Sequence, residues 1–394
     1  MGNRELFLKH ISLTNPAPML LEIERAEGVY LYKPDGTPIL DFNSGISVSS
    51  IGHNQPSVVE AVREQAGMYM HTMVYGEHIQ TPQVDLARAL SDLLPDRLDM
   101  VYFVNSGSEA IEGAMKLAKR VTGKPDIVAA RNAYHGSTHG AESLRSDIEF
   151  TYAYRPAVPG IKHIRFNRIE DLEKIDHRTA GVIIEVVQAE AGIIAAKQEF
   201  LTALRQRCNE TGSMLIFDEI QTGCGRTGKH FAFQHYGIVP DVICLAKALG
   251  GGMPLGAFIS SKENMETLID NPALGHITTF GGQPVCCAAD LAALKIWSSA
   301  PVLDNVKRIN RLMNEHLVHK DIRAVRSAGL LFAVDIGDED RVQRIYKTCL
   351  EKGVMLDWFL FDWGSIRIAP PLIISEEDAL KGVRLLLEAI EETR

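Results

Sequence analysis

The amino-acid sequence predicts an α/β protein with a large, mostly parallel sheet of seven strands, followed by a smaller α+β unit. Two patterns support this fold class. Short apolar runs rich in β-branched residues recur through the middle of the chain, and amphipathic stretches with helical spacing lie between most of them. Strands that alternate with helices are typical of a parallel sheet covered on both faces.

The N-terminal region is expected to form an arm. In it, residues 30–37 form a strand that enters a turn, residues 39–42 return as a second strand, and polar loops follow. A helical period begins at Val58 and ends near Gly67. The seven strands of the sheet are then predicted at residues 101–104, 126–130, 162–166, 181–187, 214–217, 242–245 and 256–260. The clearest helices between them cover residues 108–121 and 200–209, where apolar side chains recur at helical spacing.

The C-terminal part of the chain has a different pattern. Helices are predicted at 284–297 and 302–317, then strands near 322–325, 330–336 and 365–368 alternate with helices at 341–351 and 376–391. A chain of 394 residues exceeds the roughly 250–300 residues at which a single core stops growing. We therefore expect an N-terminal arm (1–45) that contributes to the small domain, a large domain (46–295) and a C-terminal small domain (296–394).

Composition excludes several classes of partner. The formal net charge of -9, without a long basic run, argues against nucleic acid or an anionic membrane surface. The N-terminus shows no apolar segment of a signal peptide, and the weakly charged stretch 242–261 contains Lys247 and several glycines, so no membrane span is expected. The six cysteines form no CxxC pair. We expect free thiols in the cytoplasm and no metal site.

Two apolar strands each end in a charged residue. Asp218 follows the strand at 214–217, and Lys247 follows the strand at 242–245. Ligands of open α/β sheets bind outside the carboxyl ends of the strands, so both side chains are candidates for one site. A desolvated lysine has a lowered pKa and becomes a usable nucleophile and base. A lysine that forms a Schiff base, with an acid for a pyridinium nitrogen, is typical of pyridoxal phosphate enzymes.

Three further motifs have two interpretations each. The segment 105–110, Asn-Ser-Gly-Ser-Glu-Ala, lies between a strand and a helix, where it is either a phosphate cradle or only a helix N-cap. Tyr134 is either a ring that covers a flat cofactor or part of the core, and His135 is either functional or structural. The run Gly223–Gly228 has the spelling of a dinucleotide fingerprint, but the required helix and later acid are missing, so we interpret it as a loop.

Taken together, these motifs resemble the class III (ω-type, subgroup II) aminotransferases of the acetylornithine, ornithine and 4-aminobutyrate group, which are fold-type I pyridoxal-phosphate enzymes. The resemblance covers nearly the whole chain. It rests on segments starting at Leu40, Gly52, Asn105, Tyr134, Glu185, Asp218, Lys247, Thr279 and Arg367, all in family order.

The resemblance implies a role for each matching residue. Lys247 would hold the cofactor and then act as general base and acid, while Asp218 would pair with the pyridinium nitrogen. The remaining cofactor contacts would come from Gly107, Ser108, Tyr134, Ile220, Gln221 and Thr279. Thr279 would reach the phosphate of the neighbouring subunit, which implies a homodimer with shared active sites.

Glu190 and Arg367 resemble a substrate switch. Arg367 would bind the α-carboxylate of 2-oxoglutarate or glutamate, and Glu190 would pair with Arg367 when the donor presents an ω-amine. The alternative is a plain buried ion pair. The chain departs from acetylornithine-type members at Ser137, where they carry an arginine, and in the aromatic segment 358–363 before Arg367. Those aromatic residues belong either to the small-domain core or to a wall of the substrate pocket.

The sequence therefore predicts a pyridoxal-phosphate-dependent aminotransferase. It would move an amino group from an ω-amino donor to 2-oxoglutarate by a ping-pong mechanism, with pyruvate as the less favoured alternative to 2-oxoglutarate. The alternatives are an aminomutase or epimerase of the same fold, a nicotinamide-dependent oxidoreductase based on Gly223–Gly228, and a catalytically silent scaffold.

Overall fold

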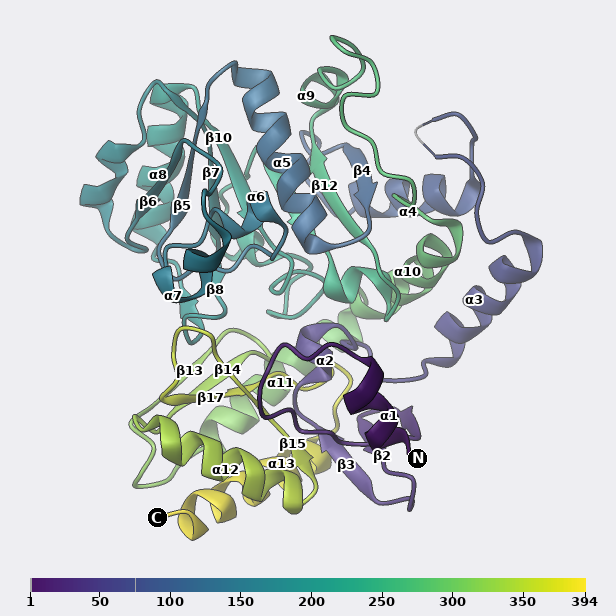
Figure 1. Ribbon diagram of the computed structural model, residues 1–394, viewed down its shortest axis with the longest axis vertical. Coiled ribbons are helices and arrows are strands. Elements are labelled where there is room, and N and C mark those ends of the chain that lie inside the picture. Colours follow the sequence, from purple (N-terminus) through teal and green to yellow (C-terminus); the bar gives the residue numbers. More distant parts are fainter. Residues whose placement is uncertain (1, 75) are drawn as a thin grey trace.

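The computed structural model describes residues 2–74 and 76–394, and its largest feature is a central seven-stranded sheet (Figure 1). The strand order is β4-β12-β11-β10-β7-β5-β6. Every neighbouring pair from β11 to β6 is parallel, whereas β12 runs antiparallel to both β11 and β4. The predicted seven-stranded, mostly parallel sheet is thus confirmed. Its strands are β4 (Met100–Val104), β5 (Asp126–Ala130), β6 (Ile161–Ile164), β7 (Thr179–Glu185), β10 (Met214–Asp218), β11 (Val242–Leu245) and β12 (Gly256–Ser260).

Helices cover this sheet on its two faces. Helix α5 (Gly107–Thr122) packs against β7, β10, β11 and β12, and α8 (Gln198–Thr211) packs against β7 and β10 (Figure 1). Helix α5 buries a run of small and apolar side chains between Ala110 and Ala118, as its predicted amphipathic spacing requires. Farther along the chain, α10 (Pro284–Trp297) packs against α3 (Pro56–Met68) and α4 (Thr81–Ser91).

A second region contains two four-stranded sheets. One has the order β13-β14-β17-β16 and consists of β13 (Ala324–Ser327), β14 (Phe332–Asp335), β17 (Ser365–Ile368) and β16 (Asp357–Trp358). The other joins the N-terminal strands β1 (Arg25–Glu27), β2 (Tyr30–Tyr32) and β3 (Pro38–Asp41) to β15 (Val354–Met355) from the far end of the chain. Helices α11 (Ala300–His316), α12 (Glu339–Glu351) and α13 (Glu376–Glu392) complete this region (Figure 1).

We propose that the chain divides into the arm 1–45, the large domain 46–295 and the small domain 296–394. The parallel pairing of β3 with β15, in which Leu40 lies opposite Val354, supports a contribution of the arm to the small domain. The end of α10 at Trp297 supports a boundary close to residue 295. A first proteolytic cut well inside 46–295 in native protein would contradict this division.

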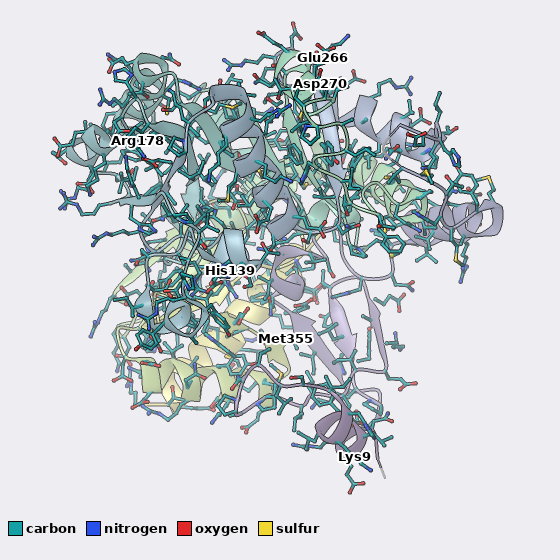
Figure 2. All side chains as sticks on the ribbon, turned by 45° about the horizontal axis from the view of Figure 1, so that its top comes forward. Lys9, His139, Arg178, Glu266, Asp270 and Met355 are labelled. Atoms are coloured by element: carbon teal, nitrogen blue, oxygen red, sulfur yellow. The ribbon has the colours of Figure 1, made fainter. Side chains whose placement is uncertain are left out.

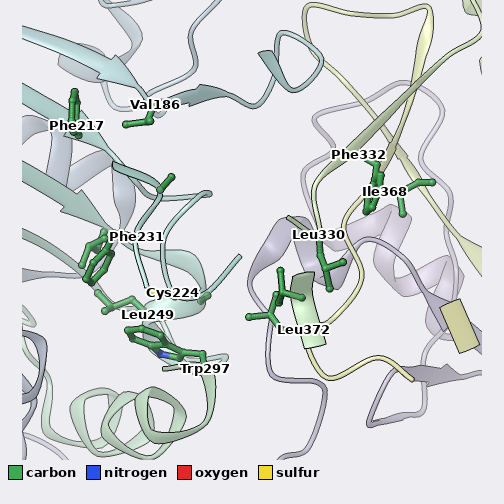
Figure 3. Packing of buried hydrophobic residues seen from close by; sticks show 14 of the residues in the cluster. Val186, Phe217, Cys224, Phe231, Leu249, Trp297, Leu330, Phe332, Ile368 and Leu372 are labelled. Carbon is green, nitrogen blue, oxygen red and sulfur yellow. The ribbon is translucent and has the colours of Figure 1, made fainter. Parts of the chain in front are cut away.

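One buried apolar cluster runs through both regions. It includes Phe217, Phe231 and Trp297 near the central sheet and Leu330 and Phe332 near the second region (Figure 3). Charged and polar side chains such as Lys9, Arg178, Glu266 and Asp270 lie at the periphery (Figure 2). Burial of one large apolar side chain contributes about 1.5–3 kcal/mol, so the continuous cluster is the main source of stability.

The run Gly223–Gly228 contains a buried arginine, Arg226, which lies at the junction of the two regions. Arg226 is 1% exposed, and its Nη2 donates to Ser50 Oγ at 2.7 Å. Its Nη1 donates to the carbonyl oxygens of Leu330, at 3.2 Å, and Pro370. Burial lowers the pKa of this guanidinium to about 9. The glycine run continues in turns and a short 3-10 helix (Ala232–His235), not in the α-helix that a dinucleotide site requires, as the sequence predicted.

The remaining helices are short: α1 (Asn3–His10), α2 (Ser44–Ser47), α6 (His139–Glu142), α7 (Ile148–Thr151) and α9 (Lys262–Glu266). A small ribbon is formed by β8 (Val187–Gln188) and β9 (Ile194–Ala195). Among the described residues, no single helix has the length and apolar character of a membrane span. The pair α10 and α11, bent by 62°, meets those criteria only when both helices are counted together.

Candidate active site

A cavity of about 450 Å³ opens at the carboxyl edge of the central sheet. Eight of the predicted site residues line it: Gly107, Ser108, Tyr134, Glu190, Asp218, Ile220, Gln221 and Lys247. Asp218 ends β10, and Lys247 follows the neighbouring parallel strand β11 after one residue, Ala246. The topology therefore brings the acid and the amine to one edge, where open α/β sheets bind their ligands.

Lys247 is held in an unusual backbone conformation. Its φ angle is +54°, in the left-handed region that non-glycine residues rarely adopt. Its Nζ donates to Gln221 Oε1 at 3.3 Å, and the amide Nε2 of Gln221 has no partner among the described residues. Burial lowers the pKa of the Lys247 amine, against the opposing charges of Glu190 and Asp218. A larger share of neutral amine at neutral pH suits a nucleophile or a base.

Asp218 is 4% exposed, and its carboxylate has two hydrogen-bond partners among the described residues. Its Oδ1 accepts from the backbone N–H of Ile220 at 3.0 Å, and its Oδ2 is 2.7 Å from His135 Nδ1. Burial acts to lower the pKa of His135, but the hydrogen bond and charge of Asp218, together with Glu185, raise it overall. This contact favours the functional interpretation of His135, because the ring fixes the orientation of the carboxylate.

A second buried carboxyl lies beside Asp218. Glu185 ends β7 directly opposite Asp218 in the parallel register. Its Oε1 accepts from the backbone N–H of Tyr134 at 3.2 Å, and its Oε2 accepts from that of Ala189 at 2.9 Å. Burial raises the pKa of Glu185 to about 7, with the nearby charge of Asp218 acting in the same direction and His135 opposing both.

The N-terminal turn of α5 forms one wall of the cavity. Ser106 caps the helix, because its Oγ accepts from the backbone N–H of Glu109 at 3.2 Å. Gly107 packs closely on Ile220: a Cβ there would lie 2.8 Å from Ile220 Cδ1, so the isoleucine side chain would have to shift. Gly136 is constrained more strongly, because its φ angle is +124° and its Cβ would lie 2.2 Å from Ser108 Oγ and 2.9 Å from Ser108 Cα. The first N–H groups of a helix have no intrahelical partner and favour an anion such as a phosphate.

Arg367 and Glu190 form the predicted buried pair. Arg367 Nη1 donates to Glu190 Oε1, and Glu190 Oε2 accepts from the backbone N–H of Leu360 at 3.1 Å. A third residue joins them, because Arg367 Nη2 donates to Asp357 Oδ2. Although burial acts to lower it, the two carboxylates raise the pKa of Arg367. Glu190 lines the cavity, whereas Arg367 reaches it through Glu190.

The structure does not bring Thr279 into the cavity. Thr279 is exposed, and its neighbour Thr278 accepts a hydrogen bond from Asn105 Nδ2 at 2.8 Å.

The aromatic segment 358–363 is partly in the core and partly at the surface. Phe359 is fully buried beside the guanidinium of Arg367, at 5.5 Å from its Cζ, whereas Trp363 is 42% exposed.

The residues around the cavity fit pyridoxal phosphate. They provide a buried acid for a ring nitrogen, an amine of lowered pKa, an amide with a free donor, and a glycine-bounded helix N-terminus for a phosphate. Together with the parallel sheet and the smaller α+β region, this set defines the class: a pyridoxal-phosphate-dependent enzyme of fold type I.

Comparisons with known proteins identify the family. The family model "Aminotransferase class-III" matches residues 12–390. The chain is 37% identical to an acetylornithine aminotransferase of Methanopyrus kandleri over 99% of both chains. It is 35% identical to a [LysW]-aminoadipate semialdehyde/glutamate semialdehyde transaminase of Sulfolobus acidocaldarius, over 94% of this chain and 95% of the relative. The ornithine aminotransferase structure from Toxoplasma gondii superposes with a TM-score of 0.91 at 26% identity, over 100% of this chain and 97% of that one.

The chain belongs to the class-III aminotransferase family. It is a transaminase, and its cofactor is pyridoxal phosphate. Its substrates are an amino donor and a 2-oxo acid. The oxidoreductase and scaffold alternatives are thereby excluded.

Sequence reasoning gave no role to Glu185 and Asp357. Glu185 could have been found, because it ends an apolar strand just as Asp218 does. Asp357 had no comparable signal, since β16 is only two residues long and its pairing with β17 becomes visible only in the folded chain.

Proposed function

We propose that this transaminase moves an amino group from an ω-amino donor to 2-oxoglutarate by a ping-pong mechanism. The names of the relatives, which act on acetylornithine and semialdehyde substrates, support this class of donor. The observation that carries the proposal is the buried pair of Glu190 and Arg367 at the wall of the cavity that contains Lys247. In one half-reaction Arg367 would stay paired with Glu190, and in the other it would bind the carboxylate of the 2-oxo acid.

The residues that would hold the cofactor surround the cavity. Gly107 and Ser108, at the start of α5, would bind the phosphate, and Tyr134 and Ile220 would enclose the ring. Asp218, oriented by His135, would keep a proton on the ring nitrogen, and Gln221 would donate its free N–H to the ring oxygen. When bound, pyridoxal phosphate supplies an electron sink that stabilises the carbanion formed at the substrate carbon.

Lys247 would carry the proton of the reaction. Its amine is neutral more often than that of an exposed lysine, because burial lowers its pKa. With the amino donor in the site, Lys247 Nζ would take a proton from one substrate carbon and return it to another atom. Gln221 lies within hydrogen-bonding distance of that amine and would limit its orientation.

Glu190 and Arg367 would distinguish the two substrates. With an ω-amine in the site, Arg367 stays paired to Glu190, so no bare cation faces the donor. With 2-oxoglutarate, Glu190 moves aside and Nη1 of Arg367 binds the α-carboxylate through charge-assisted hydrogen bonds. Ser137, whose Oγ lies 3.1 Å from the hydroxyl of Tyr134, provides no cation for a second carboxylate.

We also propose a homodimer in which Thr279 binds the phosphate of the other subunit. Phe280, the neighbour of Thr279 in the chain, is exposed, and so is Met70, which lines the same pocket as Phe280. An apolar surface of this kind favours burial against a second copy.

We place the enzyme in the cytoplasm, because all six cysteines are unpaired. Secretion of the active enzyme from producing cells would contradict that location.

The test uses Lys247→Ala beside the unchanged protein. The unchanged protein should be yellow, and borohydride should fix the cofactor on Lys247. The variant should lose turnover by at least about 10³-fold, because the nucleophile and the proton carrier disappear together. A panel of acetylornithine, ornithine, 4-aminobutyrate, β-alanine and lysine against 2-oxoglutarate and pyruvate then identifies the substrates. Near-normal turnover of the variant would refute the role of Lys247, and a panel without any ω-amine turnover would refute the donor class.

A further inference from the structure

Asp357 is a second carboxylate on the guanidinium of Arg367. The two residues lie directly opposite each other in the antiparallel pair of β16 and β17. The side chains of Asp357, Glu190 and Arg367 are 12%, 7% and 6% exposed, so all three are withdrawn from water. One cation is thus shared between two buried acids.

The two acids are attached to the fold in different ways. Asp357 belongs to the same sheet as Arg367, and its Oδ1 accepts from the backbone N–H of Trp358 at 2.9 Å. Glu190 comes from the segment between β8 and β9 and is held by the backbone N–H of Leu360. Glu190 lines the cavity, whereas Asp357 is not among the lining residues. A substrate carboxylate that enters the cavity therefore meets Glu190 first, and cross-strand pairing keeps Asp357 in place.

We propose that Asp357 is a positioning residue that acts as the permanent counter-ion of Arg367. Asp357 holds Nη2, while Nη1 exchanges Glu190 for the carboxylate of the 2-oxo acid. This inference rests on the proposed role of Arg367 in the acceptor half-reaction. It assigns the two carboxylates of the triad separate tasks: Glu190 is the exchangeable partner and Asp357 is the fixed one.

The physical reason is the cost of a lone buried charge. A guanidinium left without a counter-ion in the interior is strongly destabilised. During the exchange, after Glu190 has left Nη1 and before the substrate carboxylate is bound there, Asp357 compensates the charge of Arg367. It fixes the plane of the guanidinium throughout. Nε of Arg367 has no hydrogen-bond partner among residues 2–74 and 76–394, so it contributes nothing to that orientation. The ring of Phe359, 5.5 Å from Cζ, limits movement on one side.

The experiment compares cofactor-loaded full-length Asp357→Ala, Asp357→Asn and Arg367→Ala. Asp335→Ala is the matched control, because Asp335 lies in the same sheet and pairs with a different arginine, Arg326. The acceptors are 2-oxoglutarate and butanal, which has no carboxylate. Binding of glutarate, measured by calorimetry, provides a readout that does not depend on turnover.

For Asp357→Ala we expect the KM for 2-oxoglutarate and the Kd for glutarate to rise by at least about tenfold, as for other buried charge pairs that lose one partner. The saturated kcat, the KM of the amino donor and turnover of butanal should stay within about twofold of the unchanged enzyme, because none of them requires the exchange on Nη1. Asp357→Asn keeps an acceptor oxygen for Nη2. Its KM for 2-oxoglutarate and its Kd for glutarate should therefore lie between those of the unchanged enzyme and those of Asp357→Ala.

The outcomes separate the inference from the proposal on which it rests. If Arg367→Ala impairs 2-oxoglutarate selectively but Asp357→Ala behaves like Asp335→Ala, Asp357 has no positioning role and only the inference fails. If Arg367→Ala leaves 2-oxoglutarate unaffected, the proposed function of Arg367 fails, and the inference fails with it. If Asp357→Ala does not fold, Asp357→Asn decides by the same criteria.

Discussion

Asp290 provides a prediction about stability that is independent of the active site. It lies in α10 and is 0% exposed. After burial itself, the charge of Asp290 also raises the pKa of the nearby thiols of Cys224, Cys286 and Cys287. Within the described part of the chain, neither of its carboxyl oxygens has a hydrogen-bond partner of good geometry. Burial raises the pKa of Asp290 well above its ordinary value, and the indole of Trp297 only partly offsets this effect. Figure 3 shows that Trp297 and Cys224 lie together with Leu249 in this part of the core.

The raised pKa determines the sign of the pH dependence. The folded protein favours the protonated carboxyl, so its stability is highest below the unfolded-state pKa of about 3.9 and falls as the pH rises toward the folded-state value. Each pH unit in that window costs about 1.4 kcal/mol for a carboxyl that keeps its proton. Between about pH 3.9 and pH 7, the ionisation of Asp290 can therefore lower the free energy of unfolding by at most about 4 kcal/mol.

Asp290→Asn keeps the shape of the side chain and removes its titration. We expect little change in the free energy of unfolding near pH 4 and a gain of about 1–4 kcal/mol at pH 7. Urea denaturation of the cofactor-loaded enzyme at half-unit steps from pH 4 to 8 measures the difference. Asp304→Asn is the control, because Asp304 is an exposed carboxylate paired with Lys307. A gain that is the same at every pH, or no gain at pH 7, would refute the reasoning.

Two further predictions concern the cofactor and the dimer. In His135→Leu, Asp218 loses a charge-assisted hydrogen bond of 2.7 Å, so the affinity of the apo-protein for pyridoxal phosphate should fall by about 10–100-fold in an absorbance titration; an unchanged affinity would show that His135 is only structural. Light scattering should give twice the chain mass of 43.5 kDa, and Thr279→Ala should weaken cofactor binding without altering that mass. A monomeric particle with full activity would contradict the shared site.

The parts of the fold that could be predicted from the sequence are those with a local signal. Most strands of the central sheet are apolar runs, with β6 (Ile-Lys-His-Ile) as an exception, and the charged residue that ends β10, Asp218, reaches the carboxyl edge. Once the strands are parallel, the proximity of Lys247 to Asp218 follows from the order of β10 and β11. The helix start at Gly107 was likewise visible in its glycine and serine residues.

Contacts between distant segments had no such signal. The 2.7 Å contact of His135 with Asp218 joins residues 83 apart in the chain, and β15 pairs with β3 across more than three hundred residues. Asp357 belongs to a strand too short to show a period. Burial at a strand end also raises the pKa of Glu185, to about 7. Spacing along the chain cannot indicate such burial.

Arg226 has a consequence for the behaviour of the enzyme in salt. Its three partners, from Ser50, Leu330 and Pro370, are neutral oxygen atoms. Mobile ions screen the attraction between opposite charges, but they do not displace short hydrogen bonds from a cation that water cannot reach. The contact that this arginine makes between the central sheet and the C-terminal region should therefore persist at molar ionic strength. This contact between the two regions is thus set by buried geometry and should be independent of the ionic medium.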